Sequence, residues 1–170
     1  MSNAIQTQVR DVDETIREVM NLKDLVQQYT TLKQEETNLT YKEILKVDGS
    51  AVPEVRVPIE KLVFIDCGDE LVRRLRLPCG YVTIKEAILR TEYGKPQITV
   101  LFYVRGEEKK IGIGLSPLYL IDLLYLHVLN VHAGILSTLK EAVEREVQSE
   151  ARWVETLKEL LAMVEIVLRQ

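Results

Sequence analysis

The sequence of 170 residues contains little glycine, proline or cysteine, with 8, 5 and 2 copies. So few glycines and prolines exclude a chain that is largely low-complexity or disordered. The two cysteines, Cys67 and Cys79, are too few for a disulfide-built scaffold, and no CxxC pair is present to start a zinc site. Each cysteine precedes a glycine in an expected turn. We therefore expect two buried thiols, with a disulfide between the two turns as the alternative.

An excess of positive charge is also missing, because 22 Lys and Arg residues face 26 Asp and Glu residues. The net charge of −4 excludes a strongly basic protein that coats nucleic acid nonspecifically, since that requires clustered cations. The first residues are polar and acidic rather than apolar, so no secretory signal is expected. The predicted compartment is the cytoplasm.

An uninterrupted apolar segment is missing too. The most apolar run, residues 115–136, is long enough to cross a bilayer, but polar residues recur throughout it. These are Asp122, His127, Asn130 and His132. Because polar groups at such depths are costly in lipid, we predict a buried helix and no membrane span.

Residues 1–46 are predicted to form an N-terminal helical arm. Apolar residues recur there at steps of three and four, which draws one apolar seam along a helix whose other face is polar. The seam begins with Ile5, Val9, Val12, Ile16 and Val19. The turn sequence Asp48-Gly49-Ser50 follows the arm.

Residues 47–115 change to an alternating pattern and are predicted to form an antiparallel β-domain, a meander of four to five strands. Expected strands lie at residues 61–66, 71–77, 97–105 and 111–115. Pro53 and Pro58 indicate an irregular or edge segment at the start. Residues 81–93 fit either a strand or a short helix opened by Thr83, and we favour a strand in a hairpin.

Residues 116–170 are predicted to be helical. Ser116 and Pro117 are a favourable N-cap and first-turn pair, and residues 117–136 are apolar nearly all round. We expect this buried helix to pack on the sheet and on the N-terminal helix. Gly134 either kinks the helix or ends it and starts another. The predicted fold class is therefore α+β, with an N-terminal helix, a central β-meander and long C-terminal helices.

Residues 139–168 are predicted to carry a coiled-coil seam. Apolar residues at steps of three and four lie between side chains of both charges. The seam consists of Leu139, Val143, Val147, Val154, Leu157, Leu161, Val164 and Leu168. It has to meet either the N-terminal arm or a second subunit, and we favour a second subunit because the seam lies past the predicted core.

No set of residues predicts catalysis, a cofactor or a metal site. His127 and His132 are five residues apart, which places them on different helix faces rather than at the spacing of a helical metal pair. Asp66, Asp69 and Glu70 follow a strand, but acids in turns are usually solvated. We expect two structural histidines, solvated acids and a protein that is not an enzyme.

Basic residues gather in the β-domain, with tyrosines among them. On one sheet face they would form a cationic platform with stacking rings, suited to single-stranded nucleic acid. The interleaved acids favour a solvated outer face instead. The candidate residues are Arg73, Arg74, Arg76, Tyr81, Lys85, Arg90, Tyr93, Lys95, Tyr103 and Arg105.

The order helix, β-region, helix resembles the plan of prefoldin-type chaperone subunits, with arms at residues 5–46 and 139–168. The sequence VPIEKLVFIDCG at residues 57–68 is loosely similar to the strand region of that family. The resemblance implies an oligomer built through strands and coiled-coil arms. The apolar segment 117–136 departs from it, and no residue role is carried over.

Two hypotheses follow from the sequence. The first is a non-enzymatic structural or assembly subunit that forms a homo-oligomer, or binds a protein partner, through its coiled-coil helices. The alternative is a single-stranded nucleic-acid-binding protein that uses the basic sheet face and dimerises through the C-terminal helix.

Overall fold

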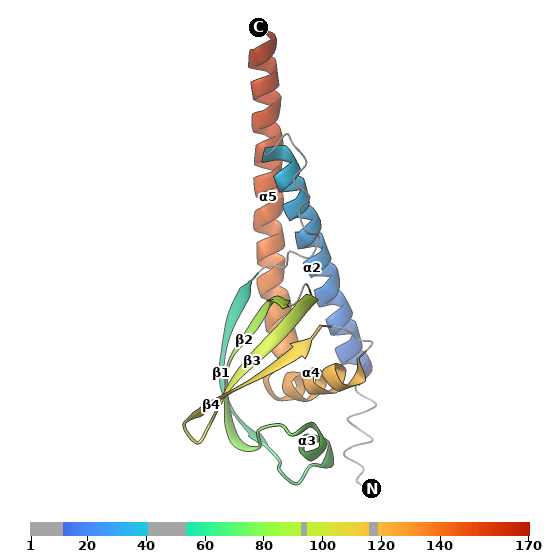
Figure 1. Cartoon of the computed structure of the whole chain (residues 1–170), viewed down its shortest axis with the longest axis vertical. Helices are drawn as coiled ribbons and strands as arrows, with labels where there is room; N and C mark the ends of the chain where they lie inside the picture. Colours follow the sequence, from blue (N-terminus) through green and yellow to red (C-terminus); the bar gives the residue numbers. More distant parts are fainter. Residues whose placement is uncertain (1–11, 41–53, 93–94, 116–118) are drawn as a thin grey trace.

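The computed structural model describes residues 12–40, 54–92, 95–115 and 119–170. It confirms the α+β class, with an N-terminal helix, an antiparallel sheet and C-terminal helices (Figure 1). In chain order the elements are α2 (Val12–Thr40), β1 (Val55–Ile65), α3 (Glu70–Leu75), β2 (Gly80–Glu92), β3 (Lys95–Val104), β4 (Glu107–Gly114), α4 (Leu120–Ala133) and α5 (Ile135–Arg169). The predicted end of the N-terminal arm, residues 41–46, lies outside the described residues.

The described strands form a four-stranded antiparallel sheet in the order β1-β2-β3-β4, which confirms the predicted meander. Over its described residues the ambiguous segment 81–93 is strand β2, paired on both sides. β1 is an edge strand, as Pro58 indicated, because proline cannot donate a ladder hydrogen bond. The β1–β2 register shifts between Pro58 and Lys61, where Glu60 adopts a φ of 49°.

The register shift between Ile84 and Glu86 explains why β2 was hard to recognise. Before the shift Val82 and Ile84 are buried, and after it Ala87 and Leu89 are buried. An irregularity of this kind interrupts the strict alternation of a strand. The favoured strand is confirmed, and the helix considered as the alternative, opened by Thr83, does not form.

The predicted strand at residues 71–77 is wrong, because residues 70–75 form helix α3. The Asp69 carboxylate accepts hydrogen bonds from the backbone N–H groups of Leu71 and Val72 at 2.8 and 3.3 Å, which caps the first turn. Val72 and Leu75 lie three residues apart on one helix face and are buried. Arg76, with a φ of 55°, ends the helix in the left-handed conformation.

The prediction of two buried thiols is also wrong. Cys67 and Cys79 form a disulfide that closes the loop containing α3. This loop is tied to the helices by the Tyr125 hydroxyl, which donates a hydrogen bond to the backbone carbonyl of Leu75. The disulfide therefore joins the end of β1 to the start of β2 and holds α3 against α4.

The apolar segment predicted as a buried helix at residues 117–136 is divided at Gly134, which is the second of the two alternatives that the sequence left open there. Ser116 and Pro117 lie outside the described residues, and α4 begins only at Leu120, after Tyr119. It ends at Ala133, because Gly134 has a φ of 61° and the chain bends there by 92° into α5. The Asn130 carboxamide oxygen accepts a hydrogen bond from the Leu136 backbone N–H at 3.0 Å, which fixes the bend.

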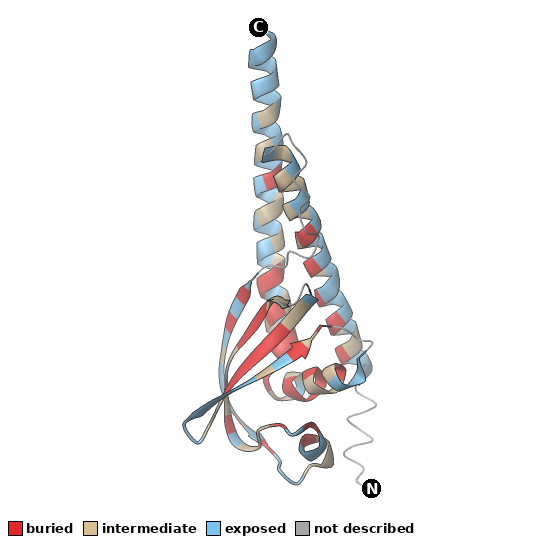
Figure 2. Cartoon of the chain, in the orientation of Figure 1, coloured by how far each residue is buried: buried red, intermediate tan, exposed pale blue. Residues whose placement is uncertain are grey.

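One hydrophobic core joins the inner face of the sheet to α2, α4 and the first half of α5. Figure 2 shows the buried residues gathered where these elements meet, while the far end of α5 is exposed. As predicted, α4 packs on the sheet and on α2. The Thr15 hydroxyl in α2 makes a buried hydrogen bond with Nδ1 of His127 in α4 at 2.7 Å, so this histidine is part of the packing.

The disulfide is expected to stabilise the fold measurably. The two cysteines are 12 residues apart in the sequence. Closing a loop of this length lowers the entropy of the unfolded chain, which adds about 3 kcal/mol to the free energy of unfolding. Cys67→Ser with Cys79→Ser should lower the free energy of unfolding in urea by about 2–3 kcal/mol. Reduced wild-type protein should match the variant. Equal stability of the oxidised wild type and the variant would contradict this assignment.

Candidate assembly surface

Helices α2 and α5 lie side by side and run in the same direction, away from the sheet (Figure 1). Three polar contacts fix their register. Lys33 pairs with Glu150 at 3.4 Å, the Trp153 indole N–H donates to Glu36 at 3.1 Å, and Lys158 pairs with Glu35 at 2.8 Å. We call the two helices the stalk.

The first half of the predicted seam is buried within this chain. Leu139, Val143 and Val154 are fully buried, and Val147 is half-buried. Leu139, Val143 and Val147 belong to the same hydrophobic core as Val19, Leu22 and Val26 of α2. Over this length the N-terminal arm covers the seam, and not the second subunit that the sequence analysis favoured.

The second half of the seam is covered only in part. We call residues 157–169 of α5 the distal segment, which continues past the end of α2 in Figure 1. Leu157 and Leu161 are half-buried, whereas Val164 is 52 % and Leu168 76 % exposed. The seam therefore leaves the fold at about Leu157.

A second apolar row, which the sequence analysis missed, lies beside the seam on the distal segment. Leu160, Met163 and Val167 are 48, 62 and 68 % exposed. These residues are spaced by three and four in the sequence. The sequence analysis assigned this spacing only to the neighbouring seam and so missed the second row. At about 100° per residue, the two rows together cover about 160° of the helix surface. Together with Val164 and Leu168, this row lines a shallow apolar groove.

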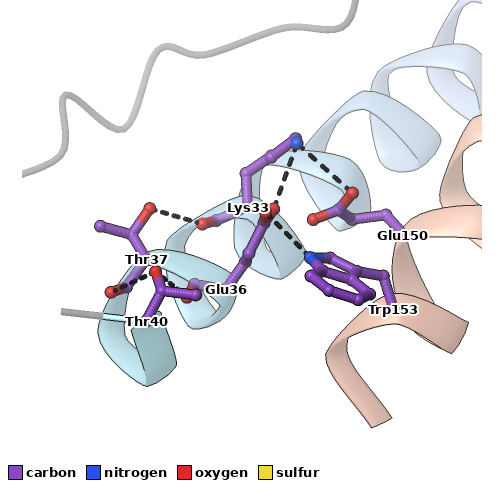
Figure 3. Close-up of polar contacts among 6 residues, drawn as sticks. All are labelled: Lys33, Glu36, Thr37, Thr40, Glu150 and Trp153. Atoms are coloured by element: carbon purple, nitrogen blue, oxygen red, sulfur yellow. Dashed lines mark hydrogen bonds and ion pairs between the residues drawn. The ribbon is translucent and has the colours of Figure 1, made fainter. Parts of the chain in front are cut away.

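A polar cluster holds the stalk together just before the distal segment (Figure 3). Lys33 reaches both the Glu36 carboxylate at 3.1 Å and the Glu150 carboxylate at 3.4 Å. The hydrogen bond from Glu150 lowers the pKa of Glu36, with Lys33 and Trp153 adding to the effect. Burial, and then the same hydrogen bond, raise the pKa of Glu150.

The cluster predicts a stability that depends on pH in two opposite ways. The contribution of Glu36 is present above its ordinary pKa of 4.5 and lost as the pH falls below it. The contribution of Glu150 is present below 4.5 and lost as the pH rises through its higher folded pKa. Glu150→Gln should therefore raise the melting temperature at pH 7, and this gain should vanish toward pH 4.

The measurement is thermal unfolding followed by the fluorescence of Trp153, the only tryptophan in the chain. Its indole lies inside the cluster, so it reports on the contact between α2 and α5. Glu141→Gln, at an exposed position on the same helix, is the matched control and should change neither melting temperature. An equal effect of Glu150→Gln at both pH values would contradict the raised pKa of Glu150.

The candidate nucleic-acid residues are only partly brought together. Tyr81, Lys85 and Tyr103 lie on the outer face of the sheet, where the Lys85 ammonium donates to the Tyr103 hydroxyl at 3.1 Å. Phe64, which the sequence analysis did not include, packs edge-on against Tyr81 with ring centroids 5.2 Å apart. Its outward position follows from the alternation of β1, in which Ile65 is buried.

The other candidates lie elsewhere. Arg73 and Arg74 are on α3 and Arg76 follows it, so the predicted arginine strand does not exist. The remaining positions are Arg90 in β2, Lys95 at the start of β3, Arg105 in the turn after β3, and Tyr93 outside the described residues. Arg74 is paired with Glu70 at 3.0 Å.

Within residues 12–40, 54–92, 95–115 and 119–170, no group of three or more His, Cys, Asp or Glu side chains is placed to hold a metal ion. No single helix in these ranges is long and apolar enough to cross a membrane; α4 and α5 reach that threshold only as a pair bent by 92°.

Burial lowers the pKa of His132, against the opposite influence of Asp69.

Comparison with known proteins finds no matching family model, no similar curated protein and no similar solved structure.

Proposed function

We propose that this chain is a non-enzymatic assembly subunit that self-associates through the distal segment of α5. The observation that supports the proposal is the exposure of two adjacent apolar rows on a helix whose first half is already packed into the fold. Contiguous apolar surface of this kind is uncommon on monomeric proteins and usually indicates an interaction site.

The fold is suited to presenting such a surface. The first half of α5 is anchored in the core through Leu136, Leu139 and Val143, all essentially inaccessible to solvent. The polar cluster around Glu36 and the ion pair between Glu35 and Lys158 hold α2 against α5 up to the start of the distal segment. A preformed helix loses little conformational entropy on binding, which favours association.

Substitution of the second apolar row tests the proposal. Leu160→Glu with Val167→Glu should dissociate the particle, because both side chains are exposed in the single chain and buried only on association. Two buried apolar side chains contribute about 3 kcal/mol or more, so the dissociation constant should rise by at least about 100-fold. Light scattering coupled to size exclusion would measure the mass over a range of concentrations.

The matched control is Gln148→Glu with Ser149→Glu, which adds the same charge at exposed positions of the same helix. It should leave the mass unchanged. The circular dichroism and melting temperature of both variants should match the wild type. A wild type that stays monomeric at all concentrations would refute self-association and leave another protein as the candidate for binding to the distal segment.

The alternative, single-stranded nucleic-acid binding, is favoured by one observation, the outward cluster of Phe64, Tyr81, Lys85 and Tyr103. If it holds, Tyr81→Ala with Tyr103→Ala should weaken binding of a labelled oligonucleotide by about 1–3 kcal/mol per stacked base. Tyr119→Ala, at an exposed position on another element, is the control. The assembly proposal expects no binding by the wild type at low salt.

A further inference from the structure

Six apolar residues of the distal segment fall at three of the seven positions of a heptad repeat, written a to g, whereas Met163 falls at c and Ile166 at f. Assigning Leu157 to position d continues the buried seam of Val143 and Val154, which then occupy positions d and a. Positions a and d are then Leu157, Leu161, Val164 and Leu168. The second apolar row supplies position g, with Leu160 and Val167, while position e holds Lys158 and Glu165.

We propose that the distal segment binds the distal segment of a second copy of this chain in an antiparallel orientation, giving a tail-to-tail dimer. The proposal rests on the function proposed above and adds the partner, the orientation and the register. The central layer pairs Leu161 of one copy with Val164 of the other. The outer layer pairs Leu157 of one copy with Leu168 of the other.

The residues at positions e and g, which flank the seam, favour an antiparallel over a parallel orientation of the two helices. In a parallel pair, position g of one helix lies beside position e of the other, so apolar Leu160 and Val167 would face charged Lys158 and Glu165. In an antiparallel pair, the two-fold axis crosses the helices and brings g beside g and e beside e. Leu160 then meets Val167 of the second copy. On the other edge Lys158 meets Glu165, which is a complementary charge pair formed twice.

The shape of the single chain fits this arrangement. The sheet, α3 and α4 all lie at one end of the molecule and the distal segment at the other (Figure 1). An antiparallel pair therefore places the two folded bodies at opposite ends of the dimer, where they do not meet. Lys158 contacts Glu35, five residues before α2 ends at Thr40, so the fully exposed part of the seam begins after Leu161.

Cysteine cross-linking tests the orientation. In the proposed register, residue 157 of one copy lies beside residue 168 of the other, whereas two copies of residue 157 are about 16 Å apart along the axis at 1.5 Å per residue. Leu157→Cys and Leu168→Cys should therefore cross-link when the two variants are mixed under mild oxidation, and neither should cross-link alone. The native Cys67 and Cys79 are already paired, so the new thiols are the only ones free to react.

Charge exchange tests the register. Lys158→Glu and Glu165→Lys should each weaken the dimer by a few-fold, since exposed ion pairs contribute little. The variant that carries both changes should recover wild-type affinity. Because Lys158→Glu also breaks the contact with Glu35 inside the chain and Glu165→Lys does not restore it, recovery reports on the pairing between copies.

The outcomes separate this inference from the function on which it rests. A dimer in which each cysteine variant cross-links with itself would overturn the antiparallel register and leave self-association standing. A wild type that is monomeric at every concentration would overturn both. A dimer that cross-links only in the mixture, with affinity restored by the double charge exchange, is the expected result.

Discussion

The packing of α2 along α5 is the interaction on which the rest of the structure depends. Residues Val19, Leu22 and Val26 cover the first half of the α5 seam, and the polar contacts at Glu150 and Trp153 set how the two helices are aligned. Because α2 accompanies α5 only part of the way, the same helix is a core element at its start and an exposed apolar surface at its end. The end of α2 therefore determines how much of α5 is exposed.

The bend at Gly134 is the second constraint. It turns the chain by 92° between α4 and α5, so α4 lies across the inner side of the sheet while α5 points away from it. The left-handed backbone at this position favours glycine, and the Asn130 side chain caps the new helix. Without the bend, α4 and α5 would continue as one helix, and α5 would not point away from the sheet.

Much of this architecture could be predicted from residue patterns, because helices and strands differ in the period of their buried residues. The α+β class and the antiparallel meander of four to five strands were predictable in this way. The errors lie where a local contact overrides the period. Leu71, Leu75 and Leu77 resemble a strand, but the Asp69 cap and the disulfide enclose a short helix instead. Pairing between two cysteines in separate turns depends on distance in space, which spacing along the chain does not reveal.

The candidate surface was predictable only in part. A seam of apolar residues was visible in the sequence, but its division into a buried and an exposed half depends on where α2 lies. The row of Leu160, Met163 and Val167 indicates a binding surface only because the structure shows that these side chains are exposed. The polar cluster of Lys33, Glu36 and Glu150 joins residues far apart in the sequence, so no local pattern could have indicated it.

Hydrogen exchange measured at several protein concentrations tests the central claim most directly. If the distal segment is buried by a second copy, the backbone amides of residues 157–169 are protected at high concentration and lose that protection on dilution. Over the same range, the amides of β2 and β3 stay protected, since they belong to the core of each single chain. Protection of the distal segment that does not change with concentration, or is absent throughout, would contradict the account.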